Sequence, residues 1–237
     1  MSNSPVKTEW IDVASPDGRF GAYLALPPAG RGPGLLLLQE IFGVNPHIRG
    51  VAEQYALAGF TVVAPDLFWR QGERIELGYG GPDWERAVQL MNTVQPAQVV
   101  GDMNATLAAL RARPECGDKV GAIGYCMGGK LAYNAAALCG VDAAVAYYGG
   151  GIQNQLDLAP KLACPVLFHY GEKDTHIPLS AVESVQSAVK AAGKQAEFHV
   201  YPGAEHGFNC WARASYGPGA AALAHGRSLQ FLAERLF

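Results

Sequence analysis

The sequence predicts an α/β fold in a single domain over residues 1–237, with a mostly parallel central β-sheet and helices on both faces. Two observations predict it. Short apolar runs of strand length alternate along the chain with longer segments of helical length. One run, Leu35-Leu36-Leu37-Leu38, is apolar without interruption, as is typical of a central strand covered on both faces. No internal repeat or interdomain linker divides the chain, so one domain is expected.

The elements follow from the chain in order. Two strands at 9–14 and 20–26 are joined by Ser15-Pro16-Asp17-Gly18, a strong turn signal, and should form an edge hairpin. The further strands are expected at 34–39, 60–64, from 119 to a glycine-rich turn, 141–148, 164–170 and 195–201. The helices are expected at 46–58, 83–93, 96–113, after that turn, 179–192 and 219–236. Residues 66–82 form a long irregular loop, and such loops are usually functional or mobile.

Composition limits the classes of function. Apolar residues make up 49% of the chain and charged residues 16%, which is typical of a globular protein. The net charge of -3 and the pI of about 6.1 argue against a nucleic-acid or membrane partner, so a small molecule is the expected ligand.

Residues 1–5 lack a signal-peptide pattern, and no apolar stretch approaches the roughly 20 residues of a membrane span. We expect a cytoplasmic protein, as a monomer or a small homo-oligomer.

The cysteines indicate a reducing compartment. The chain has 5 of them, an odd number without regular spacing, which fits reduced thiols rather than a disulfide framework. Neither Cys-x-x-Cys nor His-Glu-x-x-His occurs in the sequence. No metal site and no cofactor are therefore expected.

The stretch from Val120 to Leu131 carries the main chemical signal. A short apolar run there meets a sharp glycine-rich turn and then an alanine-rich helical pattern. Gly124 and Gly128 stand two residues before and two after Cys126, which suits a nucleophile elbow, a strained turn that leaves no room for neighbouring side chains. Cys126 would then lie at a helix N-terminus, where backbone N–H groups and the helix dipole favour a thiolate.

Two other interpretations of these residues are open. Gly124 to Lys130 also matches the start of a phosphate-binding loop, but Leu131 stands where that loop needs a hydroxyl for Mg²⁺. Cys126 could also be a buried structural cysteine beneath a tight turn, because free cysteine is commonly a small core residue. The choice depends on whether Cys126 has partners.

Two later loops supply partners. Asp174 and His206 each follow a predicted strand, in Gly171-Glu172-Lys173-Asp174 and in Gly203-Ala204-Glu205-His206. Because the carboxyl ends of parallel strands meet at one edge of a sheet, we expect both side chains near Cys126. The order nucleophile, acid, histidine is that of α/β-hydrolases. His206 would be the general base, and Asp174 would fix its tautomer and stabilise the imidazolium.

Each partner has a simpler interpretation. Asp174 alone could be a turn or N-cap aspartate, and His206 a hydrogen-bonded loop histidine. His176 is the rival base, but it stands two residues from Asp174 and is poorly suited to bridge Asp174 and Cys126. His169 and His199 fall within predicted strands and should point into packed layers.

The loop after the four leucines offers further candidates. The N–H group of Ile41, in this loop, and that of Met127, directly after Cys126, are predicted to hold a developing oxyanion together. A carboxylate at the end of a buried strand is costly unless paired, so Glu40 is predicted to take the thiol proton. The alternative for Glu40 is a solvated loop glutamate.

These residues together resemble the dienelactone hydrolases, also called carboxymethylenebutenolidases. The resemblance covers nearly the whole chain through Gln39-Glu40-Ile41-Phe42-Gly43, Ala64-Pro65-Asp66-Leu67-Phe68, Gly124-Tyr125-Cys126-Met127-Gly128-Gly129, Tyr147-Tyr148-Gly149 and Gly203-Ala204-Glu205-His206-Gly207-Phe208. It implies an α/β-hydrolase fold, a triad of Cys126, Asp174 and His206, and activation of the thiol by Glu40 when substrate binds. It also implies Ile41 and Met127 as oxyanion donors and Tyr147 near the substrate. Phe42 and Arg86 are further substrate-binding candidates of this sequence.

The sequence departs from the family at the substrate carboxylate. The best-known members hold that carboxylate with two arginines, one in the region after Pro65-Asp66 and one four residues beyond the triad histidine. Here Cys210 stands at the second position and Trp84 near the first. The candidate substitutes are Arg70, Arg74, Arg86 and Arg213.

The function expected is a cysteine hydrolase that opens lactones or cleaves small esters through an acyl-enzyme. A general carboxylesterase or thioesterase is the first alternative. A non-catalytic thiol sensor or binding protein on the same fold is the second.

Overall fold

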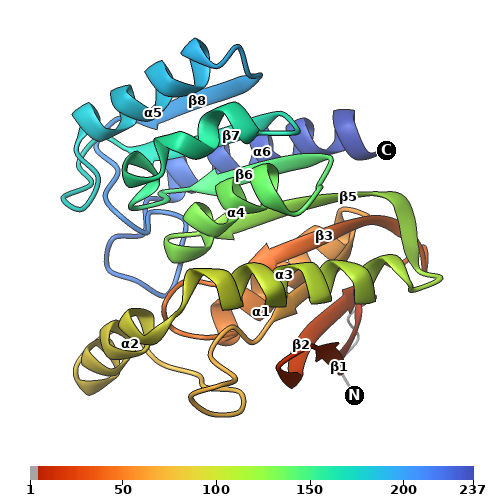
Figure 1. Ribbon diagram of the computed structural model, residues 1–237. Coiled ribbons are helices and arrows are strands. Elements are labelled where there is room, and N and C mark those ends of the chain that lie inside the picture. Colours follow the sequence, from red (N-terminus) through yellow and green to blue (C-terminus); the bar gives the residue numbers. More distant parts are fainter. Residues whose placement is uncertain (1–4) are drawn as a thin grey trace. The chain divides into compact units, whose positions relative to one another are not determined.

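A computed structural model describes residues 5–237 (Figure 1). The absence of a signal peptide is predicted from residues 1–5. Of these, residues 1–4 lie outside the described residues. The chain forms two compact units, Met1–Gly121 with Phe237 and Ala122–Leu236. The single domain expected over 1–237 stays a prediction.

The first unit combines a hairpin with parallel strands. Its strands are β1 (Lys7–Ser15), β2 (Gly18–Leu26), β3 (Gly32–Leu38) and β4 (Thr61–Pro65), in the order β1-β2-β4-β3. β1 pairs antiparallel with β2, and β2 with β4, whereas β3 and β4 are parallel. The helices are α1 (Pro46–Leu57), α2 (Pro82–Thr93) and α3 (Pro96–Arg111), with α3 in front of these strands and α1 behind them in Figure 1. All four leucines of β3 are fully buried, as the uninterrupted apolar run predicts.

β5 (Cys116–Tyr125) runs from the first unit into the second, where α4 (Met127–Leu138) follows it. Next come β6 (Ala143–Tyr147), the 3₁₀ helices η1 (Ile152–Asn154) and η2 (Leu156–Lys161), β7 (Val166–Gly171), α5 (Leu179–Ala191), β8 (Ala196–Tyr201) and α6 (Pro218–Leu236). β6, β7 and β8 pair in parallel in that order. α4 packs on β6 from the front and α6 on β6 and β7 from behind (Figure 1).

The predicted strands and helices are present, and the fold class is confirmed. The differences lie at the ends. The first hairpin is longer than predicted because Ser15 and Gly18 pair directly across the turn, and the Ser15 hydroxyl donates to the Gly18 carbonyl at 3.1 Å. The two 3₁₀ helices are not predicted, because such short elements carry no periodic apolar pattern.

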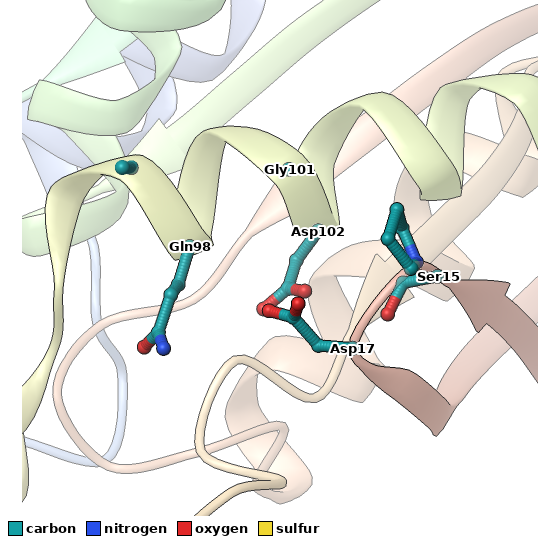
Figure 2. Close-up of a pocket in the computed structure, with 7 residues that line it drawn as sticks. Ser15, Asp17, Gln98, Gly101 and Asp102 are labelled. Carbon is teal, nitrogen blue, oxygen red and sulfur yellow. The ribbon is translucent and has the colours of Figure 1, made fainter.

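The long loop from residue 66 to 81 is held by two aspartates. Asp66 accepts the backbone N–H groups of Phe68 and Arg74 at 3.1 and 2.7 Å. Asp102, almost fully buried on α3, binds the Arg70 guanidinium at 2.6 Å. Figure 2 shows Asp102 facing Asp17 at a cavity of about 290 Å³ between α3 and the β1–β2 turn. Arg70 also binds Asp17 of the β1–β2 turn at 2.7 Å. The loop that the sequence analysis expects to be functional or mobile is therefore tied to both α3 and this turn.

Among residues 5–237, none of the helices combines the length and the apolar character that crossing a bilayer requires.

Candidate active site

The turn between β5 and α4 has the geometry of a nucleophile elbow. Cys126 adopts φ 55°, a left-handed conformation that is uncommon for a residue other than glycine. Its N–H donates to the Tyr147 carbonyl at 3.0 Å. A Cβ on Gly124 would collide with the Gly128 carbonyl, so this position requires glycine. Cys126 is partly exposed while the other cysteines are buried, so the alternative of a buried structural cysteine does not hold.

The second unit brings the three predicted side chains into one hydrogen-bonded chain. His206 Nε2 lies 3.1 Å from Cys126 Sγ, and His206 Nδ1 lies 2.8 Å from Asp174 Oδ2. The Asp174 side chain is inaccessible to solvent, and that of His206 is 10% exposed. The arrangement places an oriented imidazole between a partly exposed thiol and a buried carboxylate, as nucleophilic catalysis by cysteine requires.

Asp174 makes the contacts of both interpretations at once. While Oδ2 faces His206, Oδ1 accepts the backbone N–H groups of His176 and Ile177 at 2.8 and 3.0 Å. The turn aspartate and the histidine partner are therefore the same residue, with one oxygen for each task. The backbone hydrogen bonds fix the carboxylate plane, which in turn fixes the orientation of His206.

The surroundings of His206 favour its protonated form. Burial alone would lower its pKa, but the hydrogen bonds to Asp174 and Cys126 and the negative charge on both groups raise the pKa to about 10. At neutral pH, the site is therefore suited to an imidazolium that stabilises a neighbouring thiolate.

The raised pKa of His206 predicts a pH-dependent contribution to stability. Because the folded value of about 10 exceeds the ordinary 6.5, this contribution is fully present below about pH 6.5 and is lost as the pH rises through about 10. We expect the free energy of unfolding of the wild type to exceed that of His206→Gln at neutral pH, and the difference to shrink toward pH 10. Urea denaturation over this range measures it, and a difference independent of pH would contradict the assignment.

Two aromatic rings flank His206. The ring of His176 meets it edge-on with centroids 5.0 Å apart, and the ring of Tyr148 meets it in the same way at 5.1 Å. His176 thus contacts the imidazole of His206 but does not bridge Asp174 and Cys126, in agreement with the ranking from sequence. Tyr148 was not singled out from the sequence, although it directly follows the candidate Tyr147; it has φ 35°, a further strained backbone position.

The remaining predicted site residues have these positions. Met127 is the first residue of α4, where backbone N–H groups lack helical partners. Tyr147 is fully buried and its hydroxyl lies 2.7 Å from Ser228 Oγ. Glu40, Ile41, Phe42 and Arg86 belong to the first unit, the first three buried and Arg86 exposed on α2. The roles assigned to these six residues stay predictions.

The candidate arginines differ in their surroundings. Arg70 is engaged by Asp102 and Asp17, and the Arg74 guanidinium lies over the Trp10 ring at 4.7 Å. Arg213 packs against Gly207, so closely that a Cβ there would lie 2.5 Å from its Nη1. Arg213 is thus the candidate placed beside the residue that follows His206.

Comparison with known proteins identifies relatives over most of the chain. The model of the dienelactone hydrolase family matches residues 20–236. The chain is 36% identical over 228 residues to carboxymethylenebutenolidase 1 of Cupriavidus pinatubonensis (strain JMP 134 / LMG 1197), covering 95% of this chain and 97% of that one. It is 37% identical over 230 residues to the carboxymethylenebutenolidase of Pseudomonas sp. (strain P51), with 95% and 94% covered.

A solved structure extends the likeness to the fold. The crystal structure from Klebsiella pneumoniae subsp. pneumoniae MGH 78578, assigned there as a dienelactone hydrolase, superposes with a TM-score of 0.86 at 34% identity. The match covers 97% of this chain and 99% of that one, and the shared architecture is the α/β-hydrolase fold. The chain belongs to the dienelactone hydrolase family.

Proposed function

We propose that this protein is a carboxylic ester hydrolase that opens lactones or cleaves small esters through an acyl-enzyme on Cys126, without a cofactor. One observation carries the proposal: the hydrogen-bonded chain from Cys126 through His206 to Asp174, mounted on a strained elbow at a helix N-terminus. The names of the relatives, carboxymethylenebutenolidases, support a lactone as substrate.

The steps follow from the roles of these groups. The Cys126 thiolate attacks the carbonyl carbon, and the carbonyl oxygen becomes an oxyanion that the Met127 N–H stabilises. His206 then gives its proton to the leaving oxygen, which in a lactone stays on the same molecule. The product of this half-reaction is a thioester on Cys126.

Hydrolysis of the thioester uses the same imidazole. Once the sulfur is acylated, His206 loses the thiolate that helped to raise its pKa, and it can accept a proton from water. Water attacks, the C–S bond breaks and the thiolate leaves with His206 protonated again. Ile41 and Glu40 keep the roles that the sequence predicts for them, as second oxyanion donor and activator of the thiol.

Arg213 supports a preference for substrates that carry a carboxylate. Its guanidinium packs on Gly207, the residue after His206, and a guanidinium recognises carboxylates in bidentate geometry. A dienelactone has such a carboxylate, whereas a neutral ester does not. We expect Arg213→Gln to raise KM for a dienelactone and to leave KM for a neutral ester unchanged. Arg86→Gln, at the exposed candidate on α2, is the matched comparison.

The proposal is tested with the wild type on a dienelactone and on an activated neutral ester. Turnover of either, with an acyl mass increment on the peptide that contains Cys126 after rapid acid quenching, supports it. Turnover of neutral esters or thioesters without any preference for the anionic lactone would favour the general esterase. Absence of turnover with rapid oxidation of Cys126 by peroxide would favour the thiol sensor and contradict the proposal.

The expected setting is the cytoplasm, with the protein as a monomer or a small homo-oligomer and a small ester or lactone as its partner. Gel filtration with light scattering distinguishes the oligomeric states.

A further inference from the structure

A buried polar network lies in the second unit and is not used by the reaction steps above. Ser228 Oγ, on α6, lies 2.7 Å from the Tyr147 hydroxyl and 3.0 Å from His169 Nε2. His169 Nδ1 lies 2.9 Å from the Tyr201 hydroxyl. These four side chains come from α6, β6, β7 and β8, and at most 3% of any of them is exposed.

The protons in this network can be assigned from the acceptors. A serine hydroxyl has one proton, and that of Ser228 is donated to the Ala224 carbonyl at 2.8 Å. Tyr147 must therefore donate to Ser228, and His169 must carry its proton on Nε2. Burial lowers the pKa of His169 well below its ordinary value, so the ring is neutral and its Nδ1 accepts from Tyr201. The Ser228 oxygen thus receives two buried donors.

The two residues at the end of β6 connect this network to Cys126 and His206. The carbonyl of Tyr147 accepts the N–H of Cys126 at 3.0 Å, and the ring of Tyr148 packs edge-on against His206. β7 holds the same pair, because the Tyr148 N–H donates to the His169 carbonyl at 2.7 Å. The backbone of Tyr148 is strained, so its position depends on the contacts around it.

We propose that Ser228 is a positioning residue for the nucleophile and its base: by holding Tyr147 and His169, it fixes the end of β6 against Cys126 and His206. The expected change in kcat rests on the proposed function. The rate at which an alkylating agent modifies Cys126 does not, so it tests the role of Ser228 independently. Substitution of Ser228 by alanine leaves two buried donors without their acceptor, and the end of β6 is then expected to shift to satisfy them.

The test compares wild type, Ser228→Ala, Tyr147→Phe and the double variant. In Ser228→Ala, we expect kcat for an activated ester and the rate of Cys126 alkylation by iodoacetamide to fall about tenfold per folded molecule, with KM unchanged. In the double variant, both rates should recover in part, because one of the two stranded donors is gone. A purely structural role would lower the fraction of folded protein without changing either rate per folded molecule.

Thr106→Val is the matched control. Thr106 is fully buried on α3, and its hydroxyl makes the same type of bond, to the Asp102 carbonyl four residues earlier, at 2.7 Å. This bond lies within α3, and the variant should leave both rates unchanged. Ser228→Thr, which keeps the hydroxyl, should retain wild-type alkylation.

Several results would overturn the proposal. Wild-type rates in folded Ser228→Ala would do so, as would a double variant no faster than Ser228→Ala. If Ser228→Ala does not fold, the alkylation rate of Tyr147→Phe is decisive: slower alkylation supports the proposal, and wild-type alkylation overturns it. A wild type that alkylates rapidly but turns over no ester contradicts the proposed function, while the alkylation comparison still tests Ser228.

Discussion

Cys126→Ala is expected to lower kcat/KM for an activated ester by at least about a thousandfold, because no other group in the hydrogen-bonded chain can form the acyl-enzyme. His206→Ala should lose activity to a similar extent, since the thiol then lacks both its proton acceptor and the cation that stabilises the thiolate. The double variant should be no worse than either single one, because the two residues act as a unit. Steady-state kinetics on protein checked for folding by circular dichroism measures these effects.

Cys164→Ala is the matched control for this loss. Cys164 is buried, and burial raises the pKa of its thiol to about 12, so it is inert near neutral pH. It should keep wild-type kcat/KM. Undiminished turnover in both Cys126→Ala and His206→Ala would remove the mechanism.

Gly129→Ala is expected to cost about 3 kcal/mol in the free energy of unfolding, although the change from glycine to alanine within a helix usually stabilises a protein. A Cβ at Gly129 would collide with the Tyr147 carbonyl, the same oxygen that accepts the N–H of Cys126. The change should therefore disturb the elbow as well as the packing of α4 on β6, and activity per folded molecule should fall with stability. Urea denaturation and ester kinetics measure the two losses.

Gly101→Ala makes the same change in α3, where a Cβ would meet nothing within 4 Å. Gly101 lies at the cavity in Figure 2, so there is room for the added methyl group. We expect this variant to be more stable than wild type by about 0.5–1 kcal/mol, because alanine loses less conformational entropy than glycine in a helix. Equal stabilities of the two variants would show that close approach at Gly129 is not what requires glycine there.

Local patterns were sufficient for most of the fold. The unbroken leucines of β3 and the glycines around Cys126 indicate burial and turning without reference to distant residues. The ends of elements differ more from the prediction. β1 and β2 extend up to their turn because cross-strand pairing at Ser15 and Gly18 continues beyond the apolar pattern. The two 3₁₀ helices, η1 and η2, are too short to show a periodic apolar pattern in the sequence.

The candidate site divides in the same way. Cys126, Asp174 and His206 could be selected because each follows a strand, and parallel strands deliver such loops to one edge. The division of labour between the two oxygens of Asp174 could not, since the turn role and the histidine role look like alternatives in the sequence. Nor could the contact of Tyr148 with His206, which depends on a strained backbone at the end of β6.

By itself, the sequence determined the α/β class, the elbow and the choice of the three side chains proposed as a triad, because these depend on spacing along the chain and on the rule that places loops at strand ends. Only the tertiary structure decided that Ser228 receives hydrogen bonds from both Tyr147 and His169, and that Arg213 packs against Gly207. The physical reason is that hydrogen bonds and close packing act over a few ångströms between residues far apart in the chain. Directions of side chains inside packed layers therefore leave no periodic trace in the sequence.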